Sequence, residues 1–408
     1  MVWLRNKMDF VLYGIRIGKI NPYSFVINLV ILIYSMLEYE TILHSGSLLV
    51  IAFLVFVNIV WQVISTVNEY YSYVRKTKYY FTNESRIMDH YVLDPTIADE
   101  YELVADEIGS VIYSRRINAI MTGTTPIRMQ LSKRKTVTVD NYIRSHKDIL
   151  LPFLNYKWYE VNNNDGLFYN EAKLCMASEI ALGGDACIVM VNKGSYYDSF
   201  LTNNIYNKKM SHQNGFCIQP PFNAMNYPIC SLDVSLMNNH IGVSTLAVSE
   251  DGYTVLLRHN NRSAMFTDKL QPSGSGSVDY ADMKGTSDFR LCITRAAERE
   301  LREETGIPAD AVVVTKVIGF YRDLNRGGKP EFCCLSFLKY NRYDLTEHIR
   351  PSKSEQRDDF QLVRLFDQGR LIYKTLSDIE PVIGKECSLS LSMNLFMLCG
   401  TDGDHVRG

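Results

Sequence analysis

The feature that most constrains this chain of 408 residues is residues 299–307, which read Arg-Glu-Leu-Arg-Glu-Glu-Thr-Gly-Ile. On a helix, Glu300, Glu303 and Glu304 lie at positions i, i+3 and i+4, so three carboxylates project from one face. Like charges at this spacing repel each other, and a hard cation such as Mg²⁺, which prefers oxygen ligands, would offset the repulsion. The pattern favours a helix that presents a metal site over an ordinary solvated helix.

The same run resembles the C-terminal half of the Nudix box of the Nudix hydrolases, Arg-Glu-aliphatic-x-Glu-Glu-x-Gly-aliphatic, and agrees with it at every specified position. The upstream half agrees less well, because Gly285 stands where the box has its first glycine but Leu291 stands where it has a glutamate. In a second alignment, residues 272–277 form the glycine-rich turn and an enlarged loop follows. Both alignments lack one carboxylate, and the candidates to replace it are Asp279, Asp282 and Asp288.

The resemblance implies that Glu300, Glu303 and Glu304 are catalytic residues and ligands of Mg²⁺ or Mn²⁺, and that Arg299 orients them. In the family, the metals neutralise a pyrophosphate while a water attacks one phosphorus. We expect four further residues to bind the nucleotide, the last two from loops: Gly274, Gly276, Arg322 and Arg326. Because the box is incomplete, two alternatives stay open, a pyrophosphohydrolase and a domain that binds a nucleotide without cleaving it.

Two apolar segments near the N-terminus predict a transmembrane hairpin. Residues 23–37 are almost wholly apolar, and residues 47–67 repeat the pattern at the length of about 20 residues that a helix needs to cross a bilayer. The short connection at residues 38–46 carries two glutamates and no Lys or Arg, whereas basic residues lie on the outer flanks of both segments. The positive-inside rule then places both termini in the cytoplasm, with the chain in the cell inner membrane.

The remaining regions follow from these two features. We expect a basic amphipathic leader (1–20), two transmembrane helices (21–67), a juxtamembrane linker (68–84), a cytosolic central region that extends the Nudix domain (85–237) and the Nudix domain itself (238–408). The fold class is α+β, with the hairpin followed by a cytosolic part that ends in a Nudix α/β/α sandwich. Strand patterns at residues 242–248 and 254–258, joined by Asp251-Gly252, and a helix over residues 289–305 ending at Gly306 support this sandwich.

The central region offers fewer chemical signals. Residues 97–108 carry apolar side chains at helical spacing, and residues 186–191 read as a buried strand. The basic run 133–135 either receives phosphates or forms a solvated surface, and the second reading is the default. The net charge of −2 gives no general attraction to a nucleic acid polymer, and nine cysteines without a CxxC spacing favour reduced thiols.

A short membrane hairpin followed by a nucleotide-recognition domain resembles the membrane effectors of bacterial antiphage systems known as CBASS. The resemblance implies a cytosolic Nudix domain that senses a cyclic nucleotide, and a homo-oligomer whose transmembrane helices disrupt the inner membrane and cause abortive infection. The alternative is a membrane-anchored, Mg²⁺-dependent Nudix hydrolase of nucleoside diphosphate derivatives. The two hypotheses differ in whether the glutamates cleave the ligand or only take part in binding it.

Overall fold

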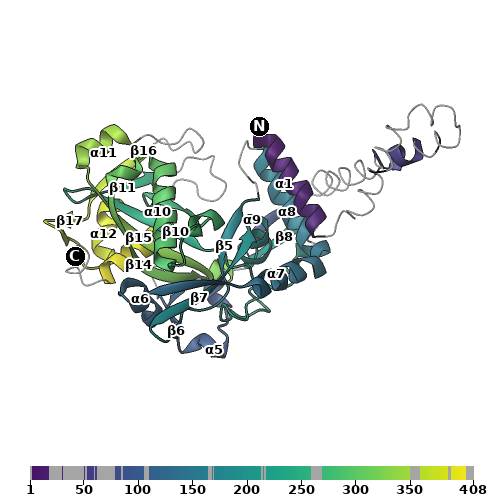
Figure 1. Ribbon diagram of the computed structural model, residues 1–408, viewed down its shortest axis with the longest axis horizontal. Helices are drawn as coiled ribbons and strands as arrows, with labels where there is room; N and C mark the ends of the chain where they lie inside the picture. The colour runs from purple at the N-terminus through teal and green to yellow at the C-terminus, as the bar shows by residue number, and fades with distance from the viewer. Residues whose placement is uncertain are drawn as a thin grey trace. The chain divides into compact units, whose positions relative to one another are not determined.

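The computed structural model describes residues 2–17, 30, 50, 53–58, 60–61, 79–83, 86–104, 110–163, 168, 170–212, 215, 217–258, 269–349, 359–384 and 387–400 (Figure 1). The chain divides into two compact units. Unit 1 comprises Met1–Thr82, Asp140–Asn170 and Lys208–Pro221, and unit 2 comprises Asn83–Val139, Glu171–Asn207 and Phe222–Gly408.

Unit 1 contains the N-terminal helix and a small sheet. Its elements are α1 (Val2–Arg16), α8 (Lys147–Asn163) and the strands β1 (Tyr79–Asn83), β8 (Lys208–His212) and β9 (Cys217–Ile218), which pair in the order β1-β8-β9. The ring of Phe10 on α1 lies 5.4 Å from the ring of Trp158 on α8, and Tyr13 is buried. The predicted amphipathic leader is thus a helix whose apolar side packs against protein, while Met8 and Leu12 remain exposed.

None of the helices in the described part of the chain is long and apolar enough to cross a bilayer. Apart from residues 30, 50, 53–58 and 60–61, the two predicted transmembrane segments lie outside the described residues. The transmembrane hairpin therefore stays a prediction.

Unit 2 is built on a nine-stranded sheet in the order β12-β11-β10-β15-β14-β3-β2, with β13 paired to β10 and β16 paired to β11. The strands are β2 (Glu102–Leu103), β3 (Val111–Tyr113), β10 (Gly242–Val248), β11 (Tyr253–Arg258), β12 (Leu270–Gln271), β13 (Gly274–Ser277), β14 (Val312–Asp323), β15 (Lys329–Leu338) and β16 (Asp359–Arg364). The pair β10 and β15 is parallel, and the hairpins β10-β11 and β14-β15 are antiparallel. The predicted hairpin with its turn at Gly252, which has φ +85°, is confirmed.

Helices cover both faces of this sheet. Side chains alternate between the two faces along each strand, so neighbouring residues of one strand enter different cores. Phe332 and Cys334 of β15 join the core beneath α10 (Phe289–Thr305), whereas Cys333 and Leu335 join the core with α12 (Leu376–Ile383) and α13 (Leu389–Gly400). Helix α10 lies against β10 and β15 (Figure 1). Unit 2 is therefore a mixed α+β fold with the sheet between two helical layers.

The central region supplies part of the same sheet and a second, smaller one. Strand β3 pairs with β14, and the second sheet has the order β4-β7-β5 with β6 paired to β7. Its strands are β4 (Ile127–Leu131), β5 (Ala172–Met176), β6 (Ala181–Gly183) and β7 (Ala186–Ser195). The strand predicted at residues 186–191 is confirmed as part of β7. The helix predicted over residues 97–108 is wrong at its centre, because Glu102–Leu103 pairs with β3 as β2.

The remaining elements of the described residues connect the strands and helices named above. They are α5 (Pro95–Ala98), α6 (Arg115–Thr122), α7 (Lys133–Ser145), α9 (Tyr196–Ser199), α11 (Arg342–His348), β17 (Phe366–Asp367), β18 (Arg370–Leu371), the π-helix η2 (Phe200–Asn204) and the 3₁₀ turns η1 (Ile87–Asp89), η3 (Tyr280–Met283), η4 (Ala309–Ala311) and η5 (Leu324–Arg326).

Candidate functional site

Helix α10 carries the glutamates, and local signals set both of its ends. The Asp288 side chain accepts a hydrogen bond of 3.0 Å from the Leu291 amide and caps the first turn. Gly306 follows the last turn with φ +76°, the left-handed conformation that glycine adopts without strain. The predicted helix over residues 289–305 is confirmed. Asp288 does not replace the missing glutamate, because its carboxylate serves as this cap.

The structure distinguishes the two alignments of the upstream half of the box. Residues 274–277 form strand β13, paired with β10, so the glycine-rich turn predicted at residues 272–277 is wrong. Gly285 adopts φ +76° in the loop before α10, as the first alignment requires of a turn glycine. In that alignment Leu291 takes the place of the glutamate, and its side chain is 42% exposed.

The two glycines of β13 allow the strand to lie directly against the C-terminal half of α10. A Cβ added to Gly274 would lie 2.6 Å from the backbone nitrogen of Leu301. A Cβ added to Gly276 would lie 2.3 Å from the carboxyl carbon of Glu300. These glycines therefore bring the strand to the box helix, and their contact with a nucleotide stays a prediction.

The guanidinium of Arg299 is the centre of the candidate site. Its Nε and Nη2 atoms lie 3.2 and 3.0 Å from the two carboxylate oxygens of Asp282, and its Nη1 lies 2.8 Å from Oε1 of Glu300. Longer contacts reach Glu303 at 3.4 Å and Asp279 at 3.7 Å. Arg299 thus contacts two of the box glutamates and two of the three candidate replacement carboxylates, and its role in orienting a metal site stays a prediction.

A second cation reaches the site from β5, a strand of the central region. The Nζ of Lys173 lies 2.6 Å from Oδ1 of Asp279 and 3.1 Å from Oε2 of Glu171. The Lys173 side chain is only 10% exposed, so this ion pair is largely shielded from solvent. Sequence reasoning missed Lys173, because no motif marks it and 106 positions separate it from Asp279.

Burial and charge together set the protonation of the cluster. Burial raises the pKa of Glu300 from 4.5 to about 7, although the neighbouring Arg299 acts in the opposite direction. Burial disfavours the charged guanidinium of Arg299, but the Asp282 hydrogen bond and the nearby carboxylates raise its pKa overall. Burial also opposes the charge of Lys173, yet Asp279 raises the pKa of this lysine above its ordinary value. Both cations are therefore charged at neutral pH, and Glu300 titrates near it.

The three box glutamates do not converge on one point. Glu300 faces Arg299, the Glu303 side chain is 55% exposed, and the buried Glu304 accepts a hydrogen bond of 3.0 Å from the Ser275 amide. Within the described ranges, no three acidic, histidine or cysteine side chains are gathered closely enough to hold a metal ion. Protein donors take up two of the three carboxylates, so a shared site for Mg²⁺ or Mn²⁺ at these glutamates stays a prediction.

Arg326 lies in η5, between β14 and β15, as the loop prediction requires. Its Nε is 2.6 Å from Asp323 and its Nη2 is 2.7 Å from Glu331. Glu331 also contacts the buried Lys329, whose pKa falls to about 8 because burial disfavours its charge. The Arg326 guanidinium is thus already paired with two carboxylates, and its contact with a nucleotide stays a prediction.

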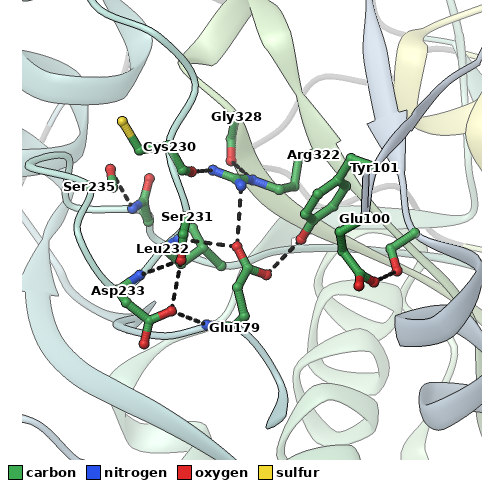
Figure 2. A network of polar contacts seen from close by, with 12 residues as sticks. Glu100, Tyr101, Glu179, Cys230, Ser231, Leu232, Asp233, Ser235, Arg322 and Gly328 are labelled. Atoms are coloured by element: carbon green, nitrogen blue, oxygen red, sulfur yellow. Dashed lines mark hydrogen bonds and ion pairs between the residues drawn. The ribbon is translucent and has the colours of Figure 1, made fainter. Parts of the chain in front are cut away.

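Arg322 lies in strand β14, so its predicted loop position is wrong. Its side chain is fully buried, and it donates hydrogen bonds of 2.8 Å to the carbonyl oxygens of Gly328 and Cys230 (Figure 2). Its Nη1 lies 3.3 Å from Glu179, which also accepts a hydrogen bond of 2.6 Å from the Tyr101 hydroxyl. Through these contacts Arg322 connects the central region to the sheet, and its side chain has no exposed surface that a ligand could contact.

The basic run at residues 133–135 begins helix α7, and it is not simply a solvated surface. Lys135 is 5% exposed, and its Nζ donates to the carbonyl oxygens of Leu232, at 2.9 Å, and Ser235. Burial lowers the pKa of Lys135 to about 8. The default interpretation, a solvated surface, is therefore wrong for this lysine, whose ammonium group binds two carbonyl oxygens in a loop of the central region.

Comparison with known proteins gives likeness at the level of structure alone. No family model matches the chain, and no curated protein matches its sequence. The MutT protein from Methanosarcina mazei Go1 is 18% identical, over 38% of this chain and 89% of that chain, with a TM-score of 0.26. The Nudix hydrolase RenU from M. smegmatis is 17% identical, over 31% of this chain and 71% of that chain, with a TM-score of 0.21. Both likenesses concern the fold of about a third of the chain.

Proposed function

We propose that this chain is a membrane effector of a bacterial CBASS antiphage system. In this proposal, the part of unit 2 that carries the box senses a cyclic nucleotide. Protomers then assemble through the apolar segments within residues 21–67 and disrupt the inner membrane. A ligand that favours the assembled state by about 5.5 kcal/mol moves its population from roughly one in a hundred to ninety-nine in a hundred.

The observation that supports sensing over hydrolysis is that donors from the protein already contact the carboxylates of the box. Glu300 pairs with Arg299, Glu304 accepts from a backbone amide, and Leu291 replaces the fourth carboxylate. Metal-assisted hydrolysis requires carboxylates that hold a cation in a fixed geometry. A sensor has no such requirement, since its ligand only has to favour one state over another.

A membrane-anchored Nudix hydrolase is the second candidate, and one observation favours it. Burial raises the pKa of Glu300 to about 7, the range in which a carboxyl group is an effective acid or base near neutral pH. The exposed Glu303 lies beside it on the same guanidinium. Cleavage of nucleoside diphosphate derivatives would use this pair of carboxylates.

The test uses the full chain reconstituted in dye-loaded lipid vesicles. Cyclic di- and trinucleotides and ADP-ribose are added one at a time with Mg²⁺, and dye release and nucleotide cleavage are followed in the same samples. We expect a cyclic nucleotide to cause release while remaining intact. The double variant Glu303→Gln/Glu304→Gln should keep this release.

Two results would count against the proposal. Cleavage of a nucleotide without dye release, lost in the double variant, would establish the hydrolase instead. Release that is the same with and without every nucleotide would exclude sensing. The genomic neighbourhood gives an independent check, because a CBASS effector is expected beside a gene for a cyclic-oligonucleotide synthase.

A further inference from the structure

The beginning of helix α7 exposes two basic and two apolar side chains together. Lys133 and Arg134 are the first two residues of the helix, and both are exposed. Val137 is 56% exposed, and it lies four positions after Lys133 and three after Arg134, so it neighbours both cations on the helix face. Leu131 is the last residue of β4, two positions before the helix, and it is 55% exposed. We call these four residues the α7 surface.

The two cations of the α7 surface are not neutralised by the part of the chain that the structure describes. Within that part, neither Lys133 nor Arg134 has an ion pair or a side-chain hydrogen bond. Asp140, the one carboxylate of α7, is paired with Arg16. The charge of both cations is therefore available to a partner.

The beginning of the helix is also held in place by unit 2. The Lys135 ammonium donates to two carbonyl oxygens of a loop in the central region, and the Ser132 amide donates to the carbonyl oxygen of Val191 on β7, at 2.7 Å. Burial lowers the pKa of Lys135, whereas the carboxylate of Asp233 acts in the opposite direction. The three cations of the run at residues 133–135, counted together with this carboxylate, still leave a positive charge.

The stability of the helix does not account for this arrangement. The first turn of a helix is the positive end of its dipole, where cations are unfavourable, and α7 has no acidic residue in that turn. An apolar residue before a helix often packs against the fourth residue of the helix, but that residue here is Thr136. The exposed cations and the exposed Leu131 therefore indicate a partner outside the chain.

We propose that the α7 surface binds a lipid bilayer with anionic headgroups. Basic side chains are attracted to the negative potential of such a leaflet, and apolar side chains among them enter the boundary between headgroups and acyl chains. A nucleic acid would attract the same cations, but single strands are bound by stacking on aromatic rings, and residues 131–137 contain none. The inference rests on the proposed function only for bringing the chain to an inner membrane, and it requires no nucleotide.

The test is the binding of the full chain to added vesicles. The chain is held in nanodiscs of phosphatidylcholine, which accommodate the predicted hairpin, so that sedimentation with the vesicles reports the rest of the chain. The vesicles contain phosphatidylcholine alone or mixed with phosphatidylglycerol. We expect the chain to sediment with the anionic vesicles only, and less so as salt is added, because salt screens exposed charges.

Two double variants test the two components of the α7 surface. Lys133→Gln/Arg134→Gln should lower the partition onto anionic vesicles by roughly thirtyfold, as expected for two basic side chains near an anionic leaflet. Leu131→Ser/Val137→Ser should lower it by a smaller factor, because only apolar contact is lost.

The matched control is Arg370→Gln/Lys374→Gln, which removes the same charge from two other exposed positions of unit 2 and should leave the partition unchanged. Melting temperatures establish that each variant is folded. Lys133→Gln/Arg134→Gln should not lower this temperature, because it removes cations from the positive end of a helix.

Three results would overturn the inference. The first is a partition of either α7 double variant equal to that of the control variant. The second is a wild type that does not sediment with either kind of vesicle. The third is such a chain binding a single-stranded RNA, with this binding lost in Lys133→Gln/Arg134→Gln, which would identify the partner as a nucleic acid.

The inference and the proposed function fail separately. Sedimentation that depends on Lys133 and Arg134, in a chain that releases no dye with any nucleotide, supports the inference and counts against the proposed function. Dye release that depends on a nucleotide, in a chain that does not sediment with anionic vesicles, overturns the inference alone.

Discussion

The protonation of Glu300 gives a quantitative test of the site. Burial raises the pKa of Glu300 to about 7, from 4.5 in the unfolded chain. The folded chain therefore binds this proton more tightly, and unfolding releases it between these two pH values. The stability of the fold falls as pH rises through this window and levels off above it.

Glu300→Gln removes this pH dependence, because glutamine has the shape of the protonated side chain and carries no charge. The difference between the two pKa values corresponds to about 3 kcal/mol. We expect the variant and the wild type to melt together near pH 4.5, and the variant to melt several degrees higher at pH 8. The groups around Glu300 that carry charge are Arg299, Glu303 and Lys173, and all three are unchanged in the variant.

The assay is the melting temperature of the full chain in detergent at a series of pH values, with Glu303→Gln as the control. Glu303 touches the same guanidinium, but its side chain is 55% exposed, so this substitution should change the melting temperature little at any pH. The reasoning predicts that the melting temperature of the wild type lies below that of Glu300→Gln at pH 8 but not at pH 4.5. The same difference in melting temperature at both pH values would refute it.

Three further substitutions test the packing around the site by their melting temperatures. Gly274→Ala should cost about 1–3 kcal/mol because its Cβ meets the backbone of α10, whereas Gly276→Ala should cost less because its Cβ meets the end of a side chain, the Glu300 carboxyl group. Arg322→Met should cost about 3–5 kcal/mol, since it leaves Glu179 without its cation, and Glu179→Gln added to it should recover part of the loss. Asp288→Ala should cost about 1 kcal/mol through loss of the helix cap.

The elements that the sequence predicts correctly are those set by neighbours in the chain. Helix α10 begins after a capping aspartate and ends at Gly306, and both signals are local. The β10-β11 hairpin is set by the glycine of its turn, Gly252, which has φ +85°. In each case a few adjacent residues determine the backbone, so their pattern is sufficient.

The features that the sequence does not predict depend on contacts between distant residues. Lys173 reaches the site only because β5 is placed beside the segment before α10, and nothing around it in the sequence indicates this. Arg322 looks like a loop cation in sequence, but β14 continues through it and buries it. The apolar spacing at residues 97–108 is helical, yet pairing of β2 with β3 overrides it. The spacing of the glutamates likewise places them on one face of the helix, but it does not determine which donor each carboxylate contacts.

The pairing of β3 with β14 also determines when this protein can finish folding. Ile112 is registered with Arg322, and the Asn118 amide that joins α6 to β14 contacts a residue 202 positions later. At the usual rate of translation, a ribosome needs about 10–40 s to make that length of chain. Throughout this interval β3 and the apolar side of α6 have emerged without their partner. A cell that makes this protein must therefore protect the first part of unit 2 from aggregation until its later strands have been synthesised.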